Sequence, residues 1–304
     1  MLLSRGNIIN DTYKVIFPIG QGAFGEVFRV KHKYFNDPQV MKVYKDEYVE
    51  KSELEEVLNE GQVLSQLSHP NLVKVYSINT FNKNGKAHYF MTMGYVSGES
   101  LKQLLKRKTK LDVPVAISIM IDVLKGLKAA HNNKPRIVHR DINTDNILLS
   151  YDDHKPVGIL GDFGIAILLD KAHSIPGAAG RYLYFAPECF MGIYLPASDV
   201  FSAGCVLYKM LTGSLPWQYD LVHSTLDDKE EISYMINSAR REKVKKPSLS
   251  NSDIDEKLEK VIMKSIEKKM ENRYRTAGSF LKALENANKT EDPSGGYWKE
   301  QDLY

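Results

Sequence analysis

A glycine-rich turn between two alternating segments constrains the fold of this 304-residue chain more than any other feature. Tyr13–Phe17 and Glu26–Val30 alternate apolar and polar residues, as strands do. The turn Gly20–Gly25 has the spacing G-x-G-x-x-G, which in a dinucleotide-binding fold leads into a helix. Because a strand follows here, the sequence predicts a β-hairpin and disfavours that fold. The glycines allow backbone N–H groups to approach phosphate oxygens, although a plain glycine-rich hairpin explains them too.

A lysine inside the next apolar segment needs an explanation. Gln39–Tyr44 is predicted to be a third strand, and Lys42 lies within it. A lysine in such a strand either binds a partner or ligand, or reaches water from the sheet edge. Ser52–Leu67 then repeats apolar residues at three- and four-residue spacing, which predicts a helix.

The remaining elements divide the chain at about residue 93. Leu72–Ile78 and Ala87–Met93 read as a fourth and a fifth strand. Beyond them helical patterns predominate, and the predicted helices are Ser100–Arg107, Val113–His131, Ser198–Leu211, Glu230–Arg241, Leu258–Lys268 and Ser279–Asn288.

The most polar segment of the chain is the turn His139–Asn146. It holds two acids, a histidine and an arginine within eight residues, and the apolar run Ile147–Leu149 follows at once. A turn this polar beside a buried strand is typical of a functional site.

Together these segments resemble eukaryotic-like (Hanks-type) serine/threonine protein kinases, and the compact spacing resembles bacterial members. The glycine turn, Lys42 and the loop H-R-D-x-x-x-x-N at His139–Asn146 occur in the family's order, followed by Asp162-Phe163-Gly164 and Ala186-Pro187-Glu188. The resemblance implies an α+β, bilobal kinase fold with a five-stranded antiparallel sheet plus the αC helix in the N-lobe. It also implies a mainly helical C-lobe. The implied domains are an N-lobe at 1–93, a hinge and C-lobe at 94–288, and a tail at 289–304.

The resemblance also implies roles for individual residues. Asp141 would accept the proton of the substrate hydroxyl, and Lys42, paired with Glu60, would hold the ATP phosphates. Asn146 and Asp162 would hold Mg²⁺, with Mn²⁺ as an alternative. Other residues expected at the nucleotide are Gly20, Gly22, Gly25, Val27, Val40, Met93, Tyr95, Val96 and Leu148. Expected structural contacts are Asp199 to the catalytic-loop backbone and Arg273 to Glu188.

Two departures from the family pattern occur together. Asn143 stands where serine/threonine kinases usually carry a lysine, and Arg181 stands where they usually carry a threonine. We hypothesise that Arg181 reaches Asp141 or the γ-phosphate and supplies the missing charge. The alternatives are that Arg181 locks an inactive loop, or that it faces solvent. Ser174 is a candidate phosphorylation site.

The expected activity is therefore ATP- and Mg²⁺-dependent transfer to Ser or Thr hydroxyls of protein substrates. The alternative is a pseudokinase or nucleotide-binding regulatory module, and small-molecule phosphotransfer is disfavoured by the Ala186-Pro187-Glu188 segment.

A net charge of +3 without a basic block argues against nucleic acid, and no apolar run is long enough to span a membrane. With only two cysteines and no signal segment, a reducing cytoplasmic location is expected. A homodimer or a regulatory partner is compatible with the sequence.

Overall fold

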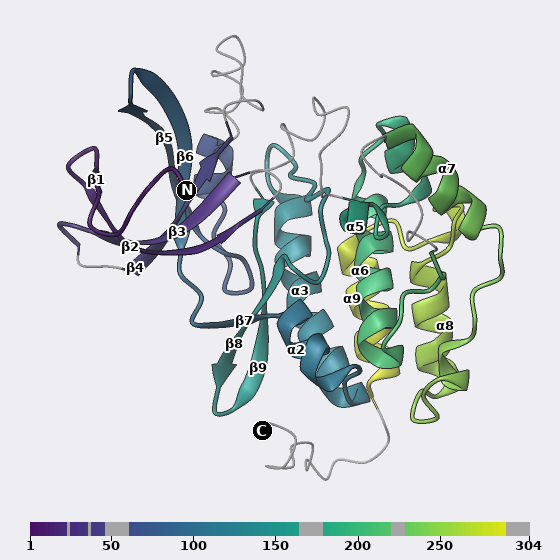
Figure 1. Ribbon diagram of the computed structural model, residues 1–304. Helices are drawn as coiled ribbons and strands as arrows, with labels where there is room; N and C mark the ends of the chain where they lie inside the picture. Colours follow the sequence, from purple (N-terminus) through teal and green to yellow (C-terminus); the bar gives the residue numbers. More distant parts are fainter. Residues whose placement is uncertain (23–24, 36–37, 46–60, 164–178, 220–228, 290–304) are drawn as a thin grey trace. The chain divides into compact units, whose positions relative to one another are not determined.

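The computed structural model describes most of the chain as two compact units (Figure 1). The described residues are 1–22, 25–35, 38–45, 61–163, 179–219 and 229–289. One unit contains the described parts of Met1–His69 and Val73–Tyr95, together with Asp162 and Phe163. The other contains Pro70–Leu72, Val96–Gly161 and the described residues from Ala179 onward.

The N-terminal unit is built on an antiparallel sheet. Its strands are β1 (Ile8–Ile9), β2 (Tyr13–Gln21), β3 (Gly25–His32), β4 (Pro38–Tyr44), β5 (Val75–Lys83) and β6 (Lys86–Gly94), in the order β1-β2-β3-β4-β6-β5. The α+β fold is confirmed, but among the described residues the sheet has six strands and not the five expected. The additional strand is β1, where only two residues pair with Tyr13 and Lys14. Of the predicted helix at Ser52–Leu67, residues 61–66 are helical, and the residues before 61 lie outside the described ranges.

The register of this sheet separates its two faces. Lys42 pairs with Val27 on one side and with Met91 on the other, and Val40 pairs with Met93. Directly paired residues, and residues two apart along a strand, point to the same face. These five side chains therefore share one face. The opposite face carries the hydrophobic core of the unit, which includes Val15, Phe28, Val30, Met41, Val43, Phe81 and Phe90.

The glycine turn connects β2 and β3, as the hairpin prediction requires. The backbone N–H of Gly22 donates to the carbonyl of Gly25 at 2.8 Å. A Cβ atom on Gly25 would lie 2.1 Å from the carbonyl oxygen of Val43, closer than any real contact. At this position, therefore, glycine is required by the approach of β4.

The second unit consists mainly of helices (Figure 1). The described ones are α2 (Leu101–Lys108), α3 (Val113–Asn132), α5 (Ala179–Tyr182), α6 (Pro196–Thr212), α7 (Lys229–Ala239), α8 (Glu256–Ser265) and α9 (Ala277–Ala287). The longer ones lie within a few residues of the predicted bounds. Three short 3₁₀ turns, at Pro187–Met191, Pro247–Leu249 and Met270–Asn272, accompany them. A small antiparallel sheet, β7 (Gly98–Ser100), β8 (Ile147–Asp152) and β9 (Lys155–Leu160), packs on α3.

Helix α6 forms the core of this unit. Nearly all its residues are buried, and it contacts α3, α8 and α9. A helix that is covered on all sides belongs to the interior of a large unit. A Cβ on Gly204 would lie 2.2 Å from Ser265 Oγ, so a glycine allows α6 and α8 to pack this closely.

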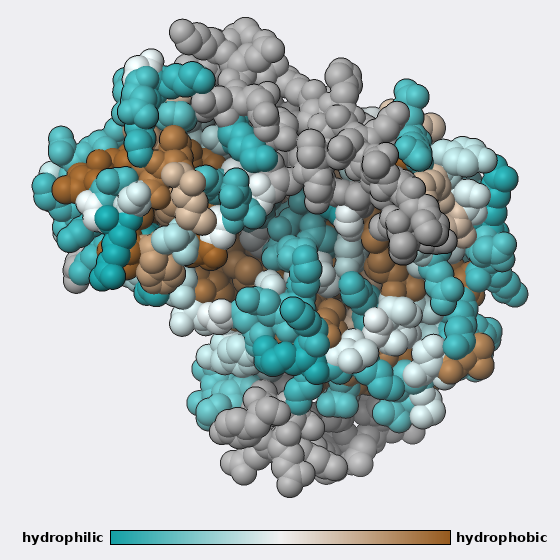
Figure 2. Space-filling model, viewed as in Figure 1, coloured by the Kyte–Doolittle hydropathy of each residue, from teal (hydrophilic) through white to brown (hydrophobic). Residues whose placement is uncertain are grey.

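The surface of the N-terminal unit shows apolar side chains among polar ones (Figure 2). Ile8, Phe17 and Ile19 are each at least 42% exposed. Scattered exposed apolar residues are normal for folded proteins.

In the part of the chain that the structure describes, no helix combines the length and the apolar character needed to cross a bilayer.

Candidate active site

Asp199, in the first turn of α6, organises the polar loop at His139–Asn146. Its Oδ1 accepts the backbone N–H of Arg140 at 2.9 Å, and its Oδ2 accepts that of His139 at 2.8 Å. His131, near the end of α3, also contacts Oδ2, through Nε2 at 2.9 Å. The Asp199 side chain is 2% exposed, and three N–H groups satisfy the buried carboxylate. The predicted bond from Asp199 to the loop backbone is therefore confirmed.

His139 stabilises the loop from within. Its Nδ1 lies 3.2 Å from the backbone N–H of Asp141, which can only donate. Nδ1 must then be the acceptor, and Nε2 carries the proton that it donates to the carbonyl of Gly161 at 2.8 Å. With both ring nitrogens used and 1% of the residue exposed, His139 has a structural role.

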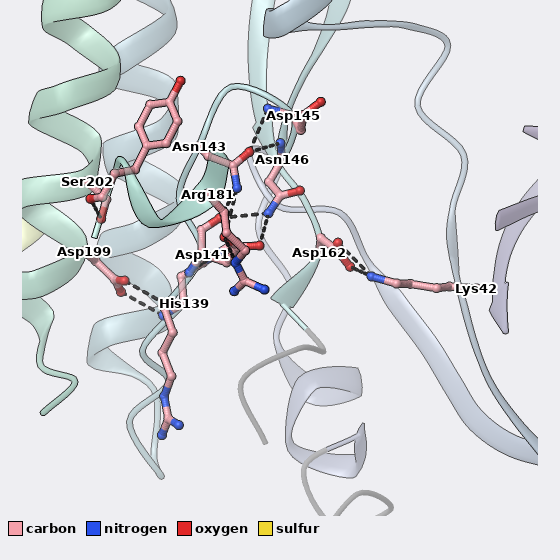
Figure 3. A network of polar contacts seen from close by, with 12 residues as sticks. Lys42, His139, Asp141, Asn143, Asp145, Asn146, Asp162, Arg181, Asp199 and Ser202 are labelled. Carbon is pink, nitrogen blue, oxygen red and sulfur yellow. Dashed lines mark hydrogen bonds and ion pairs between the residues drawn. The ribbon is translucent and has the colours of Figure 1, made fainter. Parts of the chain in front are cut away.

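The Asp141 carboxylate lies at the centre of a polar network (Figure 3). Its Oδ1 accepts a hydrogen bond from Asn143 Nδ2 at 2.9 Å, and its Oδ2 accepts one from Asn146 Nδ2 at 2.9 Å. Arg181 Nε lies 3.3 Å from Oδ1. The carboxylate is thus held by two amide groups and a guanidinium.

Asn143 fixes the turn as well as the carboxylate. While its Nδ2 contacts Asp141, its Oδ1 accepts the backbone N–H groups of Asp145 at 2.8 Å and Asn146 at 3.3 Å. An asparagine side chain that bonds the backbone two residues ahead mimics a backbone turn. Asn143 is 6% exposed, so it acts as an internal brace of the loop.

Arg181 lies in α5 and is buried, at 8% exposed. Its guanidinium carbon is 5.5 Å from the ring centre of Phe185 and 5.9 Å from that of Tyr182. Aromatic rings stabilise a desolvated cation through their negative faces. The alternative in which Arg181 faces solvent is therefore wrong for this structure.

In the N-terminal unit, Lys42 binds Asp162. The Lys42 ammonium lies 2.5 Å from Oδ1 and 2.8 Å from Oδ2 of the carboxylate. The lysine side chain is 8% exposed and the aspartate side chain 27%. Asp162 adopts a backbone φ of 63°, a left-handed conformation that aspartate tolerates better than most residues. Glu60, the partner expected for Lys42, lies outside the described residues, as does Ser174.

The other residues expected at the nucleotide are divided between the two units. Of these, Val27, Val40 and Met93 share the sheet face of Lys42, and Gly20, Gly22 and Gly25 belong to the hairpin between β2 and β3. Tyr95 also belongs to the N-terminal unit, where the Arg29 guanidinium lies 4.1 Å from its ring centre. Val96 and Leu148 belong to the second unit, with Leu148 in β8.

Comparison with known proteins gives the family. A model of the protein kinase domain matches residues 13–284. The chain belongs to the protein kinase family. A probable serine/threonine-protein kinase of Clostridium perfringens is 32% identical over 296 residues, which cover 95% of this chain and 40% of that protein. A second probable serine/threonine-protein kinase, from Clostridium acetobutylicum, is 31% identical over 285 residues, covering 92% and 40% respectively.

A solved structure shows the same fold. The kinase domain of Mycobacterium tuberculosis PknI superimposes with a TM-score of 0.69 at 22% identity, covering 94% of this chain and 99% of that one. The resemblance to bacterial kinases inferred from the sequence is thus confirmed. The chain spans about 40% of the length of the two clostridial relatives.

A buried ion pair lies in the helical unit. Arg273 donates from Nη1 to Glu188 Oε1 at 2.8 Å and from Nη2 to Oε2 at 3.3 Å, which confirms the predicted pair. Burial alone would raise the pKa of Glu188, but the hydrogen bonds and positive charge of Arg273, together with the hydrogen bonds from the backbone and from Ser198, outweigh burial and lower the pKa from its usual value. Arg273 also donates to the carbonyl of Ala197, so the pair joins the Ala186-Pro187-Glu188 segment to α6.

Several residues of the kinase site were not expected from the sequence. Tyr184 lies 3.3 Å from the Thr144 hydroxyl and accepts from Lys209 Nζ at 3.2 Å; burial raises the pKa of Tyr184 to about 12. Met91 pairs with Lys42 on the neighbouring strand β6, and their side chains share one face of the sheet. A tyrosine or a methionine in an apolar segment gives no periodic signal that separates it from core, so these contacts appear only in the folded chain.

Proposed function

We propose that this domain transfers the γ-phosphoryl group of ATP to Ser or Thr hydroxyls of protein substrates. The observation that supports the proposal best is the buried Asp141 carboxylate, held on both oxygens by Asn143 and Asn146 within the kinase loop. A fixed carboxylate acceptor is what the deprotonation of a substrate hydroxyl needs. Protein kinases act on protein substrates, and the clostridial relatives are named as probable serine/threonine kinases.

The residues present suit ATP and a divalent cation. Bound Mg²⁺–ATP supplies the phosphoryl group and offsets its charge. The Lys42 ammonium contacts both carboxylate oxygens of Asp162, so it is a group suited to binding anionic oxygens. The hydrogen bonds of Asn146 use Nδ2 and leave Oδ1 as the atom suited to a hard cation. Asp162 would be the second ligand. No cluster of three or more His, Cys, Asp or Glu side chains suited to a metal occurs among the described residues.

We assign Arg181 a place in the same chemistry. Its guanidinium lies 3.3 Å from Asp141 and replaces the cation that Asn143 lacks. The planar guanidinium of an arginine presents a rigid set of donors, which orients a neighbouring carboxylate. In the rival arrangement the same contact restrains Asp141 until a partner or modification releases it.

Transfer is tested with the purified chain, labelled ATP, Mg²⁺ and a general protein substrate. The Asp141→Asn variant is expected to lose roughly 100- to 10,000-fold in rate, because the proton acceptor is removed. Asp253→Asn makes the same chemical change at an exposed site of the same unit and should retain activity. Phosphoamino-acid analysis of the product identifies the acceptor hydroxyl.

A second candidate function is a pseudokinase that binds nucleotide without transferring phosphate. It is favoured by Asn143, since the position carries an amide bonded to Asp141 and not a cation. ATP binding by the wild type without labelled product, at a level equal to that of Asp141→Asn, would decide for this function.

The role of Arg181 has its own test. Arg181→Ala should lower transfer roughly 100-fold if the guanidinium supplies charge in the transition state. Arg181→Lys keeps the charge but not the planar geometry, and should recover part of the rate. An increase in rate in Arg181→Ala would instead show that the contact restrains the loop.

A further inference from the structure

A cavity of about 360 Å³ lies in the helical unit, and none of the residues assigned to phosphoryl transfer lines it. It is formed where the end of α3, the start of α6 and the segment before α9 meet, and its lining includes His131, Arg136, Leu195, Met270, Glu271 and Arg275. Pockets of about 300–1,000 Å³ are the size at which small molecules bind.

The charges of the lining favour an anion. Arg136 and Arg275 are exposed, and among the described residues neither forms an ion pair. Glu271 is the only acid of the lining, so two arginines and one glutamate leave one net positive charge. A single negative group would balance that charge, and a guanidinium matches a carboxylate with two parallel hydrogen bonds.

Apart from His131, Asn132 and Thr276, the rest of the lining is apolar. Leu195 and Met270 contribute alkyl and thioether surface, and Pro196 and Ala197 contribute the buried start of α6. Thioether side chains adapt to ligands of different shape. The cavity thus offers an apolar wall beside a cationic rim.

We propose that this cavity binds a small monocarboxylate with an apolar body. The carboxylate contacts Arg136 and Arg275, and the apolar body lies against Leu195 and Met270. The proposal rests on the cavity and its charges, and it holds whether or not the domain transfers phosphate.

The same cavity is connected to the catalytic loop. His131 in its wall bonds Asp199, and Asp199 accepts the backbone N–H groups of His139 and Arg140. A ligand that packs against His131 restricts this side chain and, through Asp199, the start of the loop. Occupancy is therefore expected to protect the two backbone amides.

Binding is measured by titration calorimetry on the full chain with phenylbutyrate, and with phenylbutyramide as its neutral match. Phenylbutyrate should bind at one site and the amide at least about tenfold more weakly, since hydrogen bonds between charged groups are stronger than those of a neutral amide. Arg136→Gln and Arg275→Gln should each weaken binding by about tenfold or more. Arg241→Gln removes the same charge from an exposed site that does not line the cavity, and should leave affinity unchanged.

Glu271→Gln gives a change of opposite sign. It removes the one acid of the rim and should tighten carboxylate binding, while binding of the amide stays the same. Equal affinity for the acid and the amide, no saturable binding at millimolar concentration, or losses as large in Arg241→Gln as in the two pocket variants would overturn the site. Amide hydrogen exchange at His139 and Arg140 should slow on saturation with phenylbutyrate. Unchanged exchange would overturn the link to the loop.

Discussion

The buried pair of Glu188 and Arg273 allows the most quantitative prediction. The Arg273 side chain is 0% exposed and that of Glu188 9%, so removing one partner leaves a charge without compensation in the interior. Arg273→Ala should lower the free energy of unfolding by about 3–5 kcal/mol. Lys260→Ala, which breaks the exposed pair with Glu256, should cost less than about 1 kcal/mol.

The same variant should change the dependence of stability on pH. In the wild type the pKa of Glu188 lies below 4.5, so its contribution is present above pH 4.5 and is lost as the pH falls through the folded-state pKa. Without Arg273, burial remains and shifts the pKa of Glu188 upward. The ionised carboxylate then lowers stability in place of raising it. The stability difference between wild type and Arg273→Ala should therefore narrow as the pH falls below 4.5.

Urea unfolding followed by tryptophan fluorescence measures both effects. Trp217 is 4% exposed and stacks on Phe201 at 5.9 Å, so it reports on the unit that contains the pair. A Trp298→Phe background removes the other tryptophan of the chain. The reasoning is refuted if Arg273→Ala and Lys260→Ala cost the same, or if the difference for Arg273→Ala widens in acid.

Three further predictions follow from the helical unit. Gly204→Ala should destabilise it by about 1–3 kcal/mol, because the added Cβ would overlap Ser265 Oγ; thermal unfolding measures the loss, and an unchanged Tm would contradict the packing. Cys189 and Cys205 should react with a thiol reagent only on unfolding, because burial raises the pKa of each thiol to about 12; fast labelling of the native chain at neutral pH would show that they are accessible. Asp199→Asn should speed amide exchange at the start of the catalytic loop, since each carboxylate oxygen accepts one backbone N–H and the carboxamide nitrogen that replaces one oxygen cannot accept; protection equal to wild type would rule out the carboxylate as the anchor.

The sequence predicted elements that depend on local patterns. The hairpin strands, β4 and α3 have strong periodicity, and the structure places them within a few residues of the expected bounds. β1 was missed because two residues carry no period. β7 pairs with β8 across some fifty residues of chain. Such a pairing is a long-range contact, which a single sequence read in windows does not contain.

In the candidate site too, local patterns could be predicted from the sequence and long-range contacts could not be predicted from such patterns alone. The proximity of Arg181 to Asp141 was inferred by comparison with the family's loop, because forty residues separate the two. That Asn143 braces its own turn was not foreseen, although an asparagine two residues before a backbone N–H often makes this contact. From the sequence, position 143 showed only the absence of a cation. In the structure, the Asn143 side chain donates to Asp141 and accepts a backbone N–H of its own turn.

The register of β4 limits how the chain can change length. Lys42 shares one face with Val27 and Met91, while its neighbours Met41 and Val43 lie in the core of the other face. If one residue of β4 before Lys42 were deleted and the strand pairing kept, the side chains on one side of the deletion would exchange faces. The Lys42 ammonium would then point into the core, and core side chains would point to the face that Lys42 now occupies. Insertions and deletions in related chains should therefore fall between strands, or remove two residues at once. An alignment of relatives that places a single-residue gap inside this strand would be misaligned.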